Sequence, residues 1–452
     1  MKNNMKDKVE VDSVTLSKLF QKELIIPEYQ RPYVWSEQML IKFLKQFELY
    51  FERVKNKQTE YPLYYAGCIV LHKKDEKYNI IDGQQRLTTL ALLSKLKGDL
   101  LRDLHFFQPL SFQRIKRNYN FLKEQMGDKD SLVSRVCKEL DFDKINVTII
   151  ITEDEDQAYN FFETLNTGGV RLSGTDILKA HHLRSVHESS MKDFAKDWEK
   201  RQSFLEEVNR ILFKARKMTP LRDYAHPGKY GTKAEWKTVL TEEFAEITGK
   251  KNRDLGYADV LIEKNTHTIL SDKYSIRQPL NDGENYINYL IGFTDDFDAI
   301  FYPLAPTEFY KKLNNEIIYL IDGTIDLKTY YQIALMCCVD KFGLYKKETF
   351  AFWLFRFIYS LRIGEKSRIY EATVINHLRA NMLLERILYA YTQDEVLDFL
   401  KEQKFKIDQN NIKGVKRRFL ERINWVFELN ANTETFLDLD EKLIQKIAND
   451  NN

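Results

Sequence analysis

The spacing of apolar residues predicts two kinds of structure along this chain. In the first 190 residues, short β-branched runs at 66–71, 78–81 and 145–151 alternate with segments whose apolar residues recur every three or four positions. This alternation is typical of strands followed by helices. After residue 190 the helical spacing dominates, apart from an irregular polar stretch at 252–281. The pattern therefore predicts the α+β class, with an N-terminal α+β domain followed by a mostly α-helical region.

Length and composition set the number of domains. Dividing 452 residues by roughly 150 per domain gives two or three domains. We expect a nucleotide-binding domain at 1–190, a helical connector at 191–300 and an all-helical C-terminal domain at 301–452. The 43% apolar content is incompatible with a disordered chain. Four cysteines without a C-x-x-C pair do not make a disulfide or zinc framework.

Neither a membrane nor a global attraction to nucleic acid is predicted. The apolar stretches at 333–339 and 350–361 are shorter than the ~20 residues that a membrane helix needs. The first 13 residues have no apolar segment of the kind found in secretory signals. The 69 basic and 67 acidic residues nearly cancel, so a basic surface must be local. We expect a reduced, cytoplasmic protein without membrane contact.

One local basic surface is predicted near the C-terminus. Residues 401–422 hold eight lysines and arginines against three acidic residues. Lys416, Arg417 and Arg418 are therefore candidates for contact with the phosphates of DNA. A solvated helix face is the commoner explanation of such a run, and an acidic segment follows it directly.

The densest group of chemically capable residues lies at 78–90. An apolar strand ends at Asp82, Gly83 permits a sharp turn, and a helix begins within a few residues. Free N–H groups at a helix start bind anions, Arg86 can grip phosphate oxygens, and Thr88 and Thr89 add hydroxyls. Asp82 is a candidate ligand of Mg²⁺. The alternative is a capped helix with a solvent salt bridge, but so many polar residues at one turn favour a ligand site.

A second candidate segment is Ile-Pro-Glu-Tyr-Gln-Arg-Pro-Tyr-Val-Trp at 26–35. Pro27 and Pro32 restrict the backbone, so Gln30 and Arg31 are held without a large ordering cost. For Tyr29 and Trp35 the alternative is that their rings simply cover the core. Since neither Arg31 nor Arg86 has an acidic partner at an obvious spacing, we expect the two arginines to share a polyphosphate.

The third segment, residues 161–179, places a Gly-Gly loop between two helices. Taken alone this pattern is weak, because a plain helix connection explains it. Together with the other two segments it makes Asn166, Thr167 and Arg171 candidates to close over a base or ribose.

The histidines and cysteines of the sequence predict no metal or redox site. His181, His182 and His187 are expected on one helix but lack metal-ligand spacing. Cys68 is expected in a strand as a buried core residue, and Cys337 and Cys338 as small core residues.

The three segments, in this order, resemble the DGQQR-motif N-terminal domain of GmrSD-type modification-dependent restriction proteins, in the ParB/sulfiredoxin-like superfamily. The resemblance covers about residues 12–190. It implies a ParB/sulfiredoxin-like fold and a Mg²⁺-dependent NTP-hydrolysing sensor subunit of an anti-phage restriction system. Carried over by position, the implied catalytic residues are Asp82, Gln84, Gln85 and Arg86. The implied nucleotide-binding residues are Gln30, Arg31, Gly83, Asn166 and Gly168, to which Thr88 and Thr89 are added for their hydroxyls in the first turn of the helix.

The chain departs from the family at its C-terminal end. Many members end in an HNH nuclease, which needs histidines, and no histidine follows His377. We therefore expect a separate nuclease subunit, phage or modified DNA as partner, and a homo-oligomer or hetero-complex. Two alternatives stay open: a nucleotide-gated DNA-binding scaffold without hydrolysis, and a self-sufficient ParB-like nuclease. The sequence does not identify the base of the nucleotide.

Overall fold

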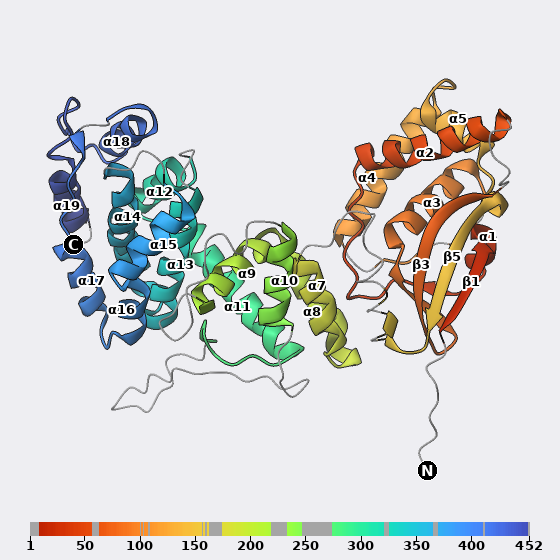
Figure 1. Cartoon of the computed structure of the whole chain (residues 1–452), viewed down its shortest axis with the longest axis horizontal. Helices are drawn as coiled ribbons and strands as arrows, with labels where there is room; N and C mark the ends of the chain where they lie inside the picture. The colour runs from red at the N-terminus through yellow and green to blue at the C-terminus, as the bar shows by residue number, and fades with distance from the viewer. Residues whose placement is uncertain are drawn as a thin grey trace, which may run out of the picture. The chain divides into compact units, whose positions relative to one another are not determined.

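The structure is a computed structural model with two compact units, Met1–Lys200 and Arg201–Asn452 (Figure 1). The predicted α+β region followed by a mostly helical region is confirmed, whereas the boundaries predicted at residues 190 and 300 stay predictions. The described residues are 9–56, 63–99, 101–102, 104–106, 109–155, 157–158, 161, 174–217, 233–245, 274–320, 325–364, 369–409 and 412–450.

The first unit contains a five-stranded sheet in the order β1-β5-β3-β4-β2. Its strands are β1 Glu10–Thr15, β2 Leu24–Ile25, β3 Tyr64–Lys74, β4 Lys77–Asp82 and β5 Ile145–Thr152. The central strand β3 runs parallel to β5 and antiparallel to β4. Three strands match the predicted runs. The strand β1 was not predicted from the sequence, because most of its residues are exposed at the sheet edge and show no apolar run.

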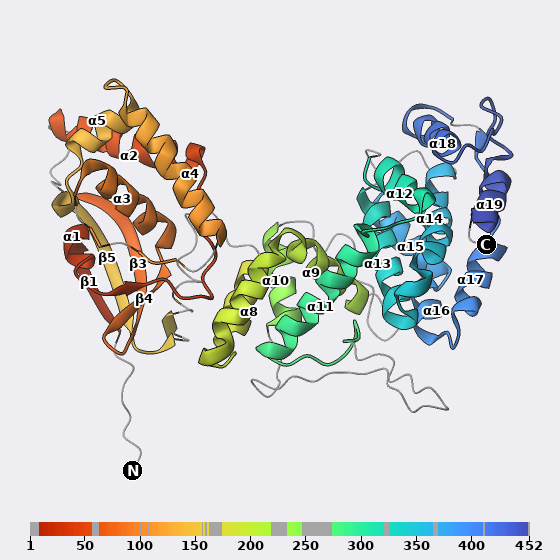
Figure 2. The same ribbon diagram turned by 180° about the vertical axis from the view of Figure 1, so that it is seen from behind.

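Helices cover one face of this sheet. They are α2 Glu37–Lys55, α3 Gln84–Lys97, α4 Pro109–Met126 and α5 Leu132–Glu139, which gather on the same side in both views (Figures 1 and 2). Apolar residues of α2 and α3 pack with those of β3 and β5 in one core. A short helix, α1 Leu16–Leu19, follows β1, and α7 Gly174–Arg184 and α8 Glu188–Lys200 close the unit.

In the described part of the second unit, the regular elements are all helices. Its two central helices, α13 Ile325–Phe342 and α14 Lys347–Ile363, are buried on almost every side, and Cys337 and Cys338 are core residues as predicted. The other helices are α9 Gln202–Lys217, α10 Lys233–Phe244, α11 Glu284–Phe301, α12 Glu308–Leu313, α15 Glu371–Ala380, α16 Leu383–Tyr389, α17 Gln393–Glu402, α18 Gly414–Val426 and α19 Leu439–Asp450.

None of the helices among the described residues is long and apolar enough to cross a membrane.

Candidate functional site

The candidate site begins where β4 passes into α3. Gly83 has φ +96°, a backbone angle that favours glycine, and a Cβ there would lie 2.2 Å from Cδ1 of Ile69. Both the backbone conformation and the lack of space therefore favour glycine at this position. No side chain caps the helix, which starts at Gln84. The first N–H groups of α3 therefore lack intrahelical partners. The strand, sharp turn and open helix start were all predicted from the sequence.

The guanidinium of Arg86 crosses the backbone of β3. Its Nη1 donates to the carbonyl of Ala66 at 2.8 Å and its Nη2 to that of Cys68 at 2.6 Å. The hairpin partner β4 pairs with β3 only from Val70 to Lys74, so it does not extend to this part of β3. Arg86 thus supplies hydrogen-bond donors to a stretch of β3 that β4 leaves uncovered.

Gly67 makes this crossing possible. Its φ is +98°, and a Cβ on it would lie 2.0 Å from Nη1 of Arg86. The register of β3 against β5 also shifts between Tyr65 and Cys68. Sequence reasoning missed Gly67, although a glycine inside a strand is a recognised sign of a bulge or a close approach.

Both arginines of the candidate site have acidic neighbours. Asp82 Oδ2 lies 3.4 Å from Nη2 of Arg86. Burial lowers the pKa of Arg31, and the carboxylates of Asp176 and Asp82 oppose that effect. The expectation that neither arginine has an acidic partner is therefore wrong. Asp82 nevertheless lies within electrostatic reach of both arginines, so the structure brings Arg31, Asp82 and Arg86 into one neighbourhood.

Four predicted site residues hold the fold together around this neighbourhood. Gln30 Nε2 donates to the carbonyl of Ile81 at 2.8 Å. Gln85 donates to the Pro32 carbonyl at 3.1 Å and accepts from the Val34 N–H at 2.9 Å. The hydroxyls of Thr88 and Thr89 donate to carbonyls one turn earlier in α3, and that of Thr89 also meets the Tyr33 hydroxyl at 2.9 Å. These side chains join the 30–35 segment to α3, and their predicted ligand roles stay predictions.

Gln84 differs from its neighbour. Its side chain is only 4% exposed, and its amide Nε2 has no hydrogen-bond partner among the residues that the structure describes. Buried amide groups are almost always paired, because an unpaired one costs about 1–3 kcal/mol. An unpaired donor at the first position of an uncapped helix is suited to an anionic ligand.

Several other predicted residues do not contribute to this geometry. Asn166, Thr167, Gly168 and Arg171 lie outside the described residues. Cys68 is half-buried rather than core, and burial raises the pKa of its thiol, with Asp82 adding to that effect and Arg86 opposing it.

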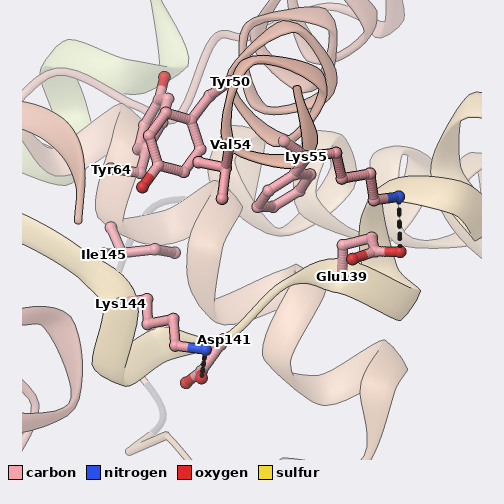
Figure 3. A pocket seen from close by; sticks show the side chains of 9 residues that line it. Tyr50, Val54, Lys55, Tyr64, Glu139, Asp141, Lys144 and Ile145 are labelled. Carbon is pink, nitrogen blue, oxygen red and sulfur yellow. Dashed lines mark hydrogen bonds and ion pairs between the residues drawn. The ribbon is translucent and has the colours of Figure 1, made fainter. Parts of the chain in front are cut away.

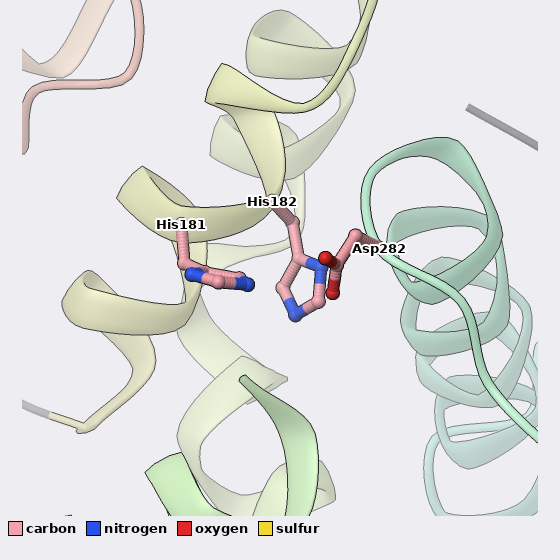
Figure 4. Close-up of side chains that lie close together, drawn as sticks. All are labelled: His181, His182 and Asp282. Atoms are coloured by element: carbon pink, nitrogen blue, oxygen red, sulfur yellow. The ribbon is translucent and has the colours of Figure 1, made fainter. Parts of the chain in front are cut away.

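The histidines also differ from expectation. His181 and His182 are neighbours on α7, and their rings meet edge to face with centroids 4.9 Å apart (Figure 4). His187 lies beyond the end of α7 at Arg184, so the expectation of one shared helix is wrong.

The three proposed DNA-binding residues all lie on α18, and their side chains differ in exposure. Lys416 is buried, with its Nζ 3.5 Å from Asp408. Arg417 pairs with Glu421 at 2.7 Å, and Arg418 is exposed. Of the three predicted residues, only the two arginines present exposed side chains, and their contact with DNA stays a prediction.

Replacing Lys416 should therefore act on stability. We expect Lys416→Ala to lower the free energy of unfolding by on the order of 3 kcal/mol, because it removes the buried cation that faces the largely buried carboxylate of Asp408. The matched control, Arg418→Ala on the same helix, should change it by less than about 0.5 kcal/mol. Urea unfolding of both variants checks this, and equal midpoints would contradict it.

Two family comparisons bear on the whole chain. Residues 16–183 match the family described as GmrSD restriction endonuclease, N-terminal domain. Residues 190–415, which make up half of the chain, match a family of unknown function (DUF7834). No curated protein matches. The first match spans the whole neighbourhood of Arg31, Asp82, Gln84 and Arg86. The protein therefore belongs to this family of unknown function, and its first unit carries a GmrSD N-terminal domain, as the three sequence motifs predicted.

Proposed function

We propose that this chain is the nucleotide-binding and nucleotide-hydrolysing subunit of a DNA restriction system that acts on phage or modified DNA. The observation that carries the nucleotide part is Gln84 at the uncapped start of α3, whose buried Nε2 has no partner within the described part of the chain. The family name of the first unit, a restriction endonuclease domain, supports the DNA part.

The start of α3 offers the triphosphate several donors at once. In this proposal the first N–H groups of the helix and Nε2 of Gln84 contribute neutral donors to the phosphates. Arg86 adds a positive charge that is already held by two carbonyls and by Asp82. These contacts occupy only part of the donor set of a guanidinium, so donors remain for phosphate oxygens. Such a preset charge needs no reorganisation as the reaction proceeds.

Asp82 is the residue that fits a magnesium ion. Its carboxylate is 23% exposed and stands at the end of β4, directly before the helix start. Mg²⁺ is commonly held by one or two carboxylates together with phosphate oxygens and water, so a single protein ligand is sufficient. The ion would neutralise charge on the phosphates. The chain itself keeps Asp82 in place through Arg86.

The segment at 30–35 gives this site its rigidity. Gln30 bonds the strand end at Ile81, and Gln85 bonds Pro32 and Val34. Arg31 belongs to this segment and lies within electrostatic reach of Asp82: burial lowers the pKa of Arg31, and the carboxylates of Asp176 and Asp82 oppose that effect. We propose that Arg31 binds the same triphosphate as Arg86.

The remaining components of the system lie outside this chain in our proposal. We propose that a separate nuclease subunit supplies cleavage. The exposed arginines Arg417 and Arg418 are proposed phosphate contacts for DNA.

The test is release of phosphate from each of the four NTPs with Mg²⁺, with and without phage DNA. We expect the wild-type protein to hydrolyse NTP. The rate should fall by at least about 10²-fold in Asp82→Asn, since the charge of the proposed Mg²⁺ ligand is removed. Asp75→Asn, in the turn between β3 and β4, is the matched control and should retain turnover. NTP binding without hydrolysis would favour the scaffold alternative, and absence of NTP binding would overturn the proposal.

A further inference from the structure

The first unit has a recess whose lining does not include the start of α3. It is a cavity of about 130 Å³ formed by the C-terminal part of α2, the first residues of β3 and β5, and the end of α5 (Figure 3). Its lining residues are Tyr50, Phe51, Val54, Lys55, Tyr64, Glu139, Asp141, Lys144 and Ile145. We call it the tyrosine pocket.

The wall of the tyrosine pocket is aromatic and held in position. The ring of Tyr64 stacks on Phe47 with centroids 4.1 Å apart. It also meets the ring of Tyr50 edge to face at 5.3 Å and 75°. Two-sided contact of this kind fixes the ring of Tyr64 before any ligand arrives. A cavity of about 150 Å³ accepts a benzene molecule, and the tyrosine pocket, at about 130 Å³, is close to that size.

The rim of the tyrosine pocket alternates donors and acceptors. Lys55 Nζ lies 2.9 Å from Glu139, and Lys144 Nζ lies 3.5 Å from Asp141. All four side chains are at least 40% exposed. Exposed pairs of this kind contribute little to stability, so their groups can exchange partners with a ligand at small cost.

An aromatic wall beside such a rim is the chemistry that recognises nucleobases. A base offers a flat face for stacking and an edge that carries both N–H donors and ring or carbonyl acceptors. A purely aliphatic ligand would leave the charged rim unused, and a plain anion would leave the aromatic wall unused.

The tyrosine pocket is also connected with the proposed phosphate site through β3. Tyr64 precedes Ala66 by two residues, about 7 Å along a strand, and the Ala66 carbonyl accepts from Arg86. Burial raises the pKa of Tyr64, and the charge of Arg86 opposes that effect. The two places are therefore neighbours along one strand.

We propose that the tyrosine pocket binds a single nucleobase, which Tyr64 and Tyr50 contact with their rings and Glu139 and Asp141 read at its edge. The base has two possible sources, the bound nucleoside triphosphate or an unstacked base of DNA. The first source rests on the proposed function, and the second does not.

Filling the pocket tests the proposal without disturbing the core. Val54 lines the pocket and is 41% exposed, so Val54→Trp blocks it from the solvent side. Leu49→Trp on the same helix is the matched control, since Leu49 is 56% exposed and does not line the pocket. Thermal unfolding of both variants verifies that they fold like the wild type.

Calorimetric titration with three probes separates the two sources. The probes are each NTP, inorganic tripolyphosphate, and a single-stranded DNA oligonucleotide. If the base comes from the nucleotide, Val54→Trp weakens NTP binding about ten-fold or more and leaves tripolyphosphate binding unchanged. If it comes from DNA, only oligonucleotide binding weakens to that degree. Leu49→Trp should behave as wild type with every probe.

Two results bear differently on the two proposals. Unchanged affinity of Val54→Trp for both NTPs and oligonucleotide overturns the tyrosine pocket as a base site. Failure of the wild type to bind any NTP or tripolyphosphate overturns the proposed function instead, and the oligonucleotide titration then still decides the pocket. Glu139→Gln adds a further readout, because a changed preference among bases supports edge reading.

Discussion

Arg86→Ala should unfold at a lower temperature than the wild type and should also lose NTP hydrolysis. The carbonyls of Ala66 and Cys68 would lose the donors that Arg86 supplies. Leaving such partly buried groups unpaired costs about 1–3 kcal/mol for each, and loss of a charged contact to the reacting phosphate lowers turnover about 10²- to 10³-fold. Scanning fluorimetry and phosphate release on the same sample measure the two effects.

The two roles of Arg86 are separable with a second variant. Gly67→Ala keeps the guanidinium but places a Cβ 2.0 Å from its Nη1, so it should lower stability by a similar mechanism. If Arg86→Ala unfolds normally yet is inactive, Arg86 acts only on the ligand. If Arg86→Ala is folded and hydrolyses NTP at the wild-type rate, Arg86 only supplies donors to β3. The assignment of Arg86 to the phosphate site is then wrong.

Gln84→Met should make the protein more stable and less able to bind nucleotide. The wild-type protein buries an amide Nε2 without a partner, and removing such a group at constant volume should raise the free energy of unfolding by about 1 kcal/mol. The same change removes a donor from the proposed phosphate site, so NTP affinity or turnover should fall by about 10²-fold. Opposite signs for stability and activity are the mark of a residue kept for a ligand.

The adjacent glutamine is the matched control. Gln85 is equally buried, but its amide bonds both Pro32 and Val34. Gln85→Met should therefore lower the free energy of unfolding. Denaturant unfolding of the two variants, with and without NTP, compares them directly. If both variants lose stability to the same extent, Gln84 has a structural partner and the proposed ligand contact is wrong.

The local pattern of the chain was enough to predict the start of α3. Apolar β-branched residues before Asp82, a glycine after it and helical spacing beyond it are features of neighbouring residues, and neighbouring residues decide a strand, a turn and an open helix start. For the same reason β3, β4 and β5 were predicted, although β3 extends further in both directions. The strand β1 was missed because its pairing with β5 rests on residues about 130 positions away.

What each polar side chain does was decided by contacts between distant segments. Gln30 meets Ile81, and Gln85 meets Pro32, at separations of about 50 residues. The carbonyls that occupy Arg86 are left uncovered only because β4 stops opposite Val70. Two glutamines that are adjacent in the sequence therefore differ, one satisfied by the fold and the other with an unpaired amide group. Composition and spacing show which residues are polar, but a hydrogen bond depends on which partner the folded chain brings within about 3 Å.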